Sequence, residues 1–319
     1  MMACMRTSSA IAILVLVAVG IGFAQRKPTD PSWAFPAPEP NAPKAKDDGK
    51  PKGIPGSSLS LTQQQIDGDP FNPPDWLPNQ HPTMPEVVAH GRKPAQACAR
   101  CHLANGNGHP ESATLTGLNA EYMIRQTYLF KSDTRKDYAS AMNAFARAMT
   151  DRDIKEAAEY FAALKPEVFN KVVEARMAPR TFIDDKFMRL PHPENGKEPI
   201  GKRIITVPEN VERTEARDPH SGFIAYVPPG SIKKGETLVK GGGGKTIACG
   251  ICHGPGLQGL GEVPRLAGQH PIFIARQLYK FQDGRNGGSW AELMKAPVAK
   301  LSGDDIIAIS AYIGSLAPK

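Results

Sequence analysis

Apolar residues recur at helical spacing in two long stretches of the chain. The first stretch spans residues 151–164, and its apolar positions are Ile154, Ala157, Ala158, Phe161 and Leu164. The second spans residues 305–316 and follows the N-cap candidate Ser302; its apolar positions are Ile306, Ile309, Ala311, Ile313 and Leu316. Such spacing puts the apolar side chains on one face of a helix, so both stretches are predicted to be helices that cover a core.

Shorter patterns predict further helices. Residues 122–130 and 272–281 are helix candidates, and one more helix is expected before each of two cysteine pairs, near residues 85–91 and 232–240. Most of the predicted structure is therefore helical.

The two halves of the chain are copies of one unit. A Cys-x-x-Cys-His motif at residues 98–102 recurs 151 residues later at residues 249–253. The same offset relates Leu115 to Leu266, Gly117 to Gly268, Gln126 to Gln277 and Phe130 to Phe281. After one inserted residue the offset is 152, and it relates Met142 to Met294, Asp153 to Asp305 and Tyr160 to Tyr312. Chance matches would not hold one register for this long, so the sequence predicts two equivalent domains.

Four segments follow the first 24 residues of the chain. Residues 81–165 and 231–319 are the two domains, and residues 25–80, rich in Pro, Lys, Asp and Gly, are expected to be an extended tether. Residues 166–230 match neither copy and are expected to be largely irregular. Within them, two stretches have strand composition and could pair as a β-hairpin: Arg203–Val207 and Gly222–Val227.

The first 24 residues have the features of an export signal. Arg6 precedes an apolar run over residues 11–23, and small residues end at Ala24. The run is short for a membrane span, so a cleaved signal and a periplasmic location are expected, with an uncleaved anchor as the alternative.

The Cys-x-x-Cys-His motif is the attachment signature of c-type haem. Two thiols three residues apart can form thioethers with one porphyrin, and the next imidazole can bind its iron. We therefore expect covalent haem at Cys98 and Cys101 with His102 on the iron, and a second haem at Cys249 and Cys252 with His253. A redox disulfide is a weaker interpretation because it does not require the adjacent histidine. A zinc site built from all four cysteines is also weaker, because it would join two copies that each look self-sufficient.

Each iron needs a ligand on its other side. Met142 and Met294 hold matching positions between the motif and the last helix, so they are the candidates. Met149 competes in the first copy but matches Leu301, an ordinary packing position. Six other histidines have no counterpart in the other copy and are expected at the surface or in loops: His81, His90, His109, His192, His220 and His270. A backbone carbonyl, at Ala113 and at Pro264, is expected to accept a hydrogen bond from each ligand histidine.

Composition adds two points. Aromatic residues make up only 7% of the chain, and a haem would fill the cores that they leave. The formal charge is +7, which favours acidic partners, and no nucleic-acid-binding motif accompanies it.

Each copy resembles a class I cytochrome c domain, and the pair resembles tandem dihaem cytochromes c. The second copy carries the motifs Cys-Gly-Ile-Cys-His-Gly, Pro-Arg-Leu-Ala-Gly-Gln, Gln-Leu-Tyr-Lys-Phe and Leu-Ser-Gly-Asp-Asp-Ile. The first copy departs by having Leu103, Ala113 and Leu118 in place of Gly, Pro and Gln. The resemblance implies an all-α fold with the haem in a crevice. It also implies single-electron transfer from a dehydrogenase or a quinol-oxidising complex to an oxidase or reductase.

Two other functions stay open from the sequence. An enzyme such as a dihaem peroxidase would fit if Met142 did not bind its iron. A cytochrome subunit of a dehydrogenase complex, which could be associated with a membrane, would give residues 166–230 a docking role.

Overall fold

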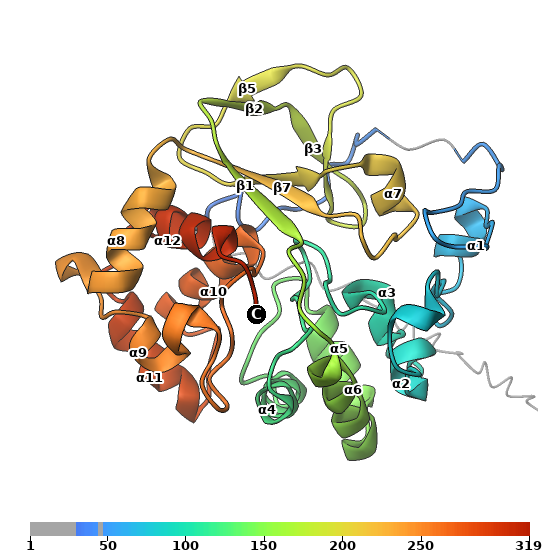
Figure 1. Ribbon diagram of the computed structural model, residues 1–319, viewed down its shortest axis with the longest axis horizontal. Coiled ribbons are helices and arrows are strands. Elements are labelled where there is room, and N and C mark those ends of the chain that lie inside the picture. The colour runs from blue at the N-terminus through green and yellow to red at the C-terminus, as the bar shows by residue number, and fades with distance from the viewer. Residues whose placement is uncertain (1–29, 44–46) are drawn as a thin grey trace, which may run out of the picture.

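The computed structural model describes residues 30–43 and 47–319, so the predicted export signal lies outside the described residues. Two helical units lie side by side, and strands of the middle segment cover both from one side (Figure 1). The first unit consists of α2 (Glu86–Ala89), α3 (Cys98–His102), α4 (Ala120–Lys131), α5 (Ala141–Ala148) and α6 (Asp151–Ala163). The second consists of α8 (Ser231–Gly241), η2 (Gly242–Gly244), α9 (Gly250–His253), η3 (Pro255–Leu257), α10 (Pro271–Gln282), α11 (Ser289–Val298) and α12 (Gly303–Ser315).

The helices predicted from apolar spacing are confirmed as α6, α12, α4 and α10, and the helices before the cysteine pairs as α2 and α8. The helices that carry the candidate methionines, α5 and α11, were not predicted. Pro297 lies inside α11, a position where proline removes a helical hydrogen bond, and this helps to explain why the pattern was weak there.

The last helix of each unit is fixed at its start by a buried aspartate. Asp305 in α12 accepts hydrogen bonds from the N-cap Ser302 and forms ion pairs with Lys234 and Lys245 of the same unit. Asp153 in α6 makes the same capping box with Thr150. The duplicated Asp-Ile pair therefore has one structural role in both copies.

The first and last helices of the second unit cross in close contact. A Cβ on Gly235 in α8 would overlap the carbonyl oxygen of Ala308 in α12, so only glycine fits at this crossing. The apolar face of α12, including Ile306 and Ile313, is buried beneath it.

The middle segment is richer in strands than expected. It contains β1 (Asn170–Glu174), β2 (Met177–Pro179), β3 (Thr181–Ile183), β4 (Arg189–Pro191), β5 (Lys197–Pro199), β6 (Ile205–Pro208), α7 (Val211–Glu215) and β7 (Phe223–Val227). The two predicted strands are β6 and β7, which pair antiparallel with α7 between them in the chain. On its other side β7 pairs parallel with β1, and two-stranded sheets join β2 to β5 and β3 to β4. The segment therefore contains more regular structure than expected, because strands separated along the chain pair with one another, as β7 does with β1 and β6.

The described part of the N-terminal stretch packs against the body and is not an extended tether. It contains α1 (Gln63–Asp67) and η1 (Pro78–Gln80). Trp76 is 3% exposed and its indole Nε1 donates to the Ala216 carbonyl at 2.7 Å. Ile54, Ile66 and Leu77 complete this small core. Within residues 30–43 and 47–319, no helix has both the length and the apolar character needed to cross a membrane.

Candidate functional site

The cysteines of each motif lie on one short helical turn. Cys98 and Cys101 belong to α3, and Cys249 is the N-cap of α9, one turn before Cys252. Residues three apart on a helical turn project to the same side, as attachment to one porphyrin requires. Burial raises the pKa of the Cys98 thiol to about 12 and that of Cys249 to about 11.

The structure tests the two competing readings of the cysteines. All four are free thiols with no disulfide among them. Among the described residues, no group of three or more His, Cys, Asp or Glu side chains is placed to hold a metal ion, so the four-cysteine zinc site does not form.

Both motif histidines are buried and held by the expected carbonyls. His102 Nδ1 lies 2.9 Å from the Ala113 oxygen, and His253 Nδ1 lies 2.9 Å from the Pro264 oxygen. Since a carbonyl can only accept, Nδ1 carries the proton and Nε2 keeps its lone pair for a metal. Burial also lowers the pKa of both imidazoles, which favours the neutral form that a metal binds.

The residue after each motif histidine has a positive φ angle, but the two copies use different residue types at this position. Gly254 adopts φ +75° without cost, whereas Leu103 adopts φ +61°. A left-handed conformation costs a non-glycine residue about 1–3 kcal/mol. Leu103 is 9% exposed and packs against Phe169 and Phe223 of the middle segment, which offsets this cost. Leucine in place of glycine therefore gives the first copy an apolar contact with the middle segment.

The candidate methionines lie at matching places, Met142 in α5 and Met294 in α11, and both are partly buried. Met149, the competitor in the first copy, is 8% exposed and packs in the apolar core with Ile154. The structure thus gives Met149 the packing role that its match with Leu301 predicted.

The loops that orient the two histidines are hydrogen-bonded to each other. Arg265, which follows Pro264, donates from Nη2 to the Thr116 oxygen at 2.8 Å. Gln269 donates from Nε2 to the oxygen of Thr114, the neighbour of Ala113, at 3.0 Å. The two sites therefore share one rigid polar interface between the units.

That interface buries more cations than anions. Arg276 pairs with Glu111, and Arg285 pairs with Asp30. Lys280, 4% exposed, and Arg265, 3% exposed, have no carboxylate within ion-pair distance in the described part of the chain. Burial, and then the nearby Arg135, lower the pKa of Lys280 to about 7.

Buried charges need partners. The propionate carboxylates of bound haems would supply negative partners for Lys280 and Arg265 at this interface, so these two residues fit the cofactor. No local pattern in the sequence indicates this cluster, because its members come from separate segments of both copies.

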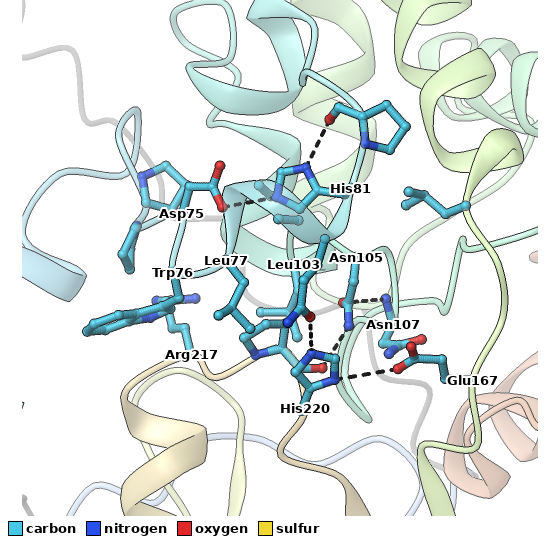
Figure 2. A pocket seen from close by; sticks show the side chains of 18 of the residues that line it. Asp75, Trp76, Leu77, His81, Leu103, Asn105, Asn107, Glu167, Arg217 and His220 are labelled. Atoms are coloured by element: carbon cyan, nitrogen blue, oxygen red, sulfur yellow. Dashed lines mark hydrogen bonds and ion pairs between the residues drawn. The ribbon is translucent and has the colours of Figure 1, made fainter. Parts of the chain in front are cut away.

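Two further features stand out. A cavity of about 320 Å³ lies between the N-terminal stretch and the first unit, and Ala99 and Leu103 of the first attachment turn line it together with His81, Asn105 and His220 (Figure 2). His270 is 0% exposed and packs edge-on against Phe223, and burial lowers its pKa to about 3. This histidine therefore lies in a loop, the one before α10, as expected, but it is buried and not at the surface.

Comparisons with known proteins point in the same direction. No protein-family model matches the chain. Cytochrome c4 from Pseudomonas aeruginosa is 26% identical over 235 residues, which cover 72% of this chain and 88% of that protein. Cytochrome c4 from Azotobacter vinelandii is 27% identical over 242 residues, which cover 72% of this chain and 89% of that protein. A protein named thiosulfate dehydrogenase electron acceptor, from Thiomonas intermedia, is 24% identical over 227 residues, which cover 69% of this chain and 79% of that protein.

Solved structures include similar chains. Reduced cytochrome c4 from Pseudomonas stutzeri has a TM-score of 0.45 at 24% identity, covering 69% of this chain and 93% of that one. A thiosulfate dehydrogenase from Marichromatium purpuratum has a TM-score of 0.47 at 26% identity, and this chain covers 37% of its length.

Proposed function

We propose that this chain, a homologue of the dihaem cytochromes c4, is a periplasmic carrier of single electrons with two covalently attached haem c groups. The thiols of Cys98 and Cys101 hold the first haem, and those of Cys249 and Cys252 hold the second. The cytochromes c4 are electron-transfer proteins and not enzymes. When bound, each haem supplies a one-electron iron couple.

The observation that carries this proposal is the identical orientation of His102 and His253. In each copy the imidazole Nδ1 donates to a carbonyl 11 residues further along the chain, at 2.9 Å. This hydrogen bond fixes the ring and directs Nε2 toward the iron. Met142 and Met294 supply the opposite ligand in our proposal. Two protein ligands per iron leave no open position for substrate, which suits a carrier.

The described residues contribute more than ligands. The loops bearing Ala113 and Pro264 are joined by Arg265 and Gln269, so the relative position of the two histidines is fixed. Little rearrangement of the protein then accompanies a change of iron charge. The buried cations Lys280 and Arg265 would offset the negative charge of haem propionates bound near the interface.

The proposed donor is a dehydrogenase or a quinol-oxidising complex, and the acceptor is an oxidase or reductase. The relatives named thiosulfate dehydrogenase electron acceptor support a dehydrogenase as the donor class. A permanent cytochrome subunit of such a complex is the second candidate, because the middle segment adds three small sheets outside the two haem-binding units.

The ligand assignment is tested by absorption spectroscopy of the oxidised protein. Methionine bound to ferric haem gives a weak band at the red edge of the visible spectrum. Met142→Ala and Met294→Ala should each remove about half of its intensity, because each deletes one of two equivalent iron–sulfur bonds. Met149→Leu is the matched control and should leave the band intact. If Met149→Leu removes about half of the band and Met142→Ala leaves it intact, Met142 is not the ligand.

A further inference from the structure

Two charged positions recur in the duplication at the offset of 151. Glu111 of the first unit corresponds to Glu262 of the second, and Arg125 of α4 corresponds to Arg276 of α10. The structure pairs each arginine with the glutamate of the other unit. Arg276 binds Glu111 at 2.7 Å, and Arg125 binds Glu262. The two ion pairs are therefore reciprocal, and both cross the boundary between the units.

Each arginine also binds the backbone of the loop that carries the glutamate. Arg276 Nη1 donates to the carbonyl oxygen of Pro110 at 2.8 Å, and Arg125 Nη2 donates to the carbonyl oxygen of Glu262 at 3.2 Å. A guanidinium has several donors in a fixed planar arrangement, so it can bind a carboxylate and a nearby carbonyl together. Each arginine thus holds the course of a loop in the other unit and not only one side chain.

The loops held in this way are the ones that orient the ligand histidines. Glu111 lies two residues before Ala113, whose carbonyl oxygen accepts from His102. Glu262 lies two residues before Pro264, which holds the ligand histidine of the second unit in the same way. The position of such a carbonyl sets both the orientation and the basicity of the imidazole. A contact two residues away along the loop limits the movement of that carbonyl.

The two ion pairs differ in burial. The side chains of Arg276 and Glu111 are 3% and 8% exposed, and the hydroxyl of Tyr138 also donates to Glu111. Burial alone would lower the pKa of Arg276, but Glu111 outweighs it and raises the pKa, so the guanidinium stays charged. The side chains of Arg125 and Glu262 are 22% and 43% exposed. Since breaking a buried pair perturbs a protein more than breaking an exposed one, the first haem site should depend more strongly on its pair.

We propose that Arg276 and Arg125 are positioning residues that act across the boundary: each holds the histidine–carbonyl hydrogen bond at the haem of the other unit. This inference rests on the proposed function, because it takes both motif histidines to be iron ligands. A well-held hydrogen bond makes the imidazole a better electron donor, which stabilises the oxidised iron. Loosening either arginine therefore raises the reduction potential of the opposite haem.

The test follows the Nδ1 protons of His102 and His253 by NMR in the reduced, full-length holoprotein carrying isotope-labelled histidine. Exchange of each proton with solvent deuterium reports how firmly its hydrogen bond is held. Arg276→Gln should speed exchange at least tenfold at His102 and less than twofold at His253. Arg125→Gln should give the crossed pattern, at least threefold at His253 and less than twofold at His102. Acceleration at the histidine of the same unit, or at neither histidine, overturns the proposal.

A redox titration separates positioning from charge. The double variant Glu111→Gln/Arg276→Gln removes one charge of each sign, so a direct charge effect on the iron largely cancels, whereas the loss of positioning remains. Followed through the His102 signal, it should raise the ratio of reduced to oxidised first haem at least threefold at the wild-type midpoint potential. At about 59 mV per tenfold change for a one-electron couple, this is a shift of about 28 mV. An unchanged ratio contradicts positioning.

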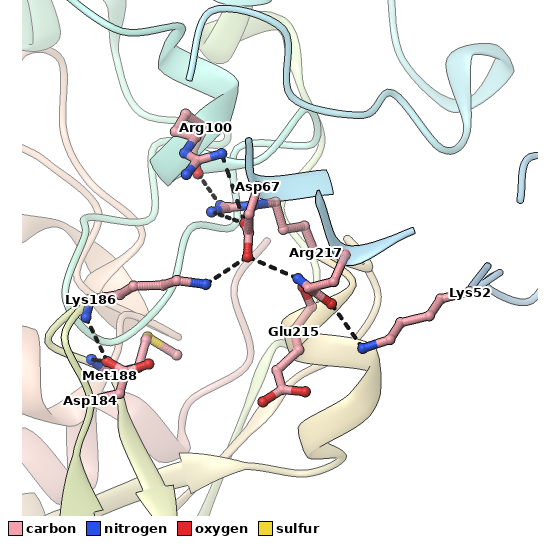
Figure 3. Close-up of polar contacts among 9 residues, drawn as sticks. Lys52, Asp67, Arg100, Asp184, Lys186, Met188, Glu215 and Arg217 are labelled. Atoms are coloured by element: carbon pink, nitrogen blue, oxygen red, sulfur yellow. Dashed lines mark hydrogen bonds and ion pairs between the residues drawn. The ribbon is translucent and has the colours of Figure 1, made fainter. Parts of the chain in front are cut away.

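Arg217→Gln is the matched control. Arg217 pairs with Asp67 at 2.8 Å and donates to the carbonyl oxygen of Arg100 in the first attachment turn at 2.5 Å (Figure 3). Its side chain is 16% exposed, so the variant also breaks a largely buried ion pair beside the first site, at the attachment turn and not at the histidine loop. It should change exchange at either histidine less than twofold. Exchange at His102 as fast as in Arg276→Gln would overturn the proposal, because any lost ion pair nearby would then suffice.

Loss of stability has its own signature. Faster exchange at both histidines in one variant means general loosening and also overturns the proposal. If Arg276→Gln does not fold, the double variant replaces it in the exchange experiment with the same expected values, since it removes both charges of the buried pair. Failure of the proposed function shows earlier, because the Nδ1 signals of the wild-type protein would then lack the ring-current shift of an iron-bound imidazole.

Discussion

Replacing Asp305 with alanine should destabilise the second unit markedly. The carboxylate is 0% exposed and accepts from Ser302 Oγ at 2.7 Å and from the Ser302 amide at 3.0 Å. It also pairs with Lys234 at 2.8 Å and with Lys245 at 2.6 Å. Loss of the capping interaction costs about 1 kcal/mol. The two lysine side chains are nearly half exposed and regain water when the carboxylate is removed, so each pair adds at most about 1 kcal/mol.

The expected loss is therefore about 2–3 kcal/mol in the free energy of unfolding, measured by guanidinium denaturation of the holoprotein at pH 7. Asp304→Ala is the matched control, because Asp304 is 49% exposed and its ion pair among the described residues is with the exposed Lys202; it should cost no more than about 0.5 kcal/mol. Ion pairing and capping lower the pKa of Asp305 despite its burial. A depressed carboxyl pKa gives stability that is present above the ordinary value of 3.8 and is lost as the pH falls below it. The difference between wild type and Asp305→Ala should thus shrink between pH 5 and pH 3. Equal losses for the two variants, or a difference independent of pH, would refute this reasoning.

Three further changes test other parts of the structure. Gly235→Ala should destabilise the protein by at least about 2 kcal/mol because a Cβ overlaps the α12 backbone, whereas Gly241→Ala, with open space around it, should not; thermal unfolding distinguishes them. Trp76→Phe removes the bond to the Ala216 carbonyl, which costs about 1 kcal/mol, and should make the N-terminal stretch more susceptible to limited proteolysis. Lys280→Met removes a buried lysine that is mostly charged at pH 6, below its pKa of about 7, and should lower at least one haem reduction potential by on the order of 50 mV in a redox titration at that pH, since the oxidised iron carries more positive charge.

The sequence was most informative where chemistry fixes the spacing. A haem-attachment motif has to be contiguous, so it can be recognised from five residues. The hydrogen-bond partners Ala113 and Pro264 were predictable because a loop of fixed length returns to the histidine, and both are confirmed. Helices with a strong apolar stripe, such as α6 and α12, were likewise predicted.

The sequence failed where a small number of residues pack against a distant segment. Composition suggested that residues 25–80 could not pack, yet Trp76 and Ile66 suffice for a small core, because Ala216 from the middle segment closes it. The same limitation explains His270, a loop residue whose burial depends on Phe169 and Phe223 from the distant middle segment. Neither the Trp76–Ala216 contact nor the His270–Phe223 contact can be recognised from a local pattern in the sequence.

The duplication shows which features the haem motif imposes and which it leaves open. Both copies hold the histidine by a carbonyl and the last helix by a buried aspartate, and these contacts lie inside each unit. What lies outside differs: Arg100 is covered by Asp67 and Arg217, whereas Ile251 faces solvent. Two sites with the same internal geometry can differ in function only through their surroundings. We therefore expect the roles of the two units to be set by the N-terminal stretch and the middle segment, since these contact the first attachment turn and leave the second one open.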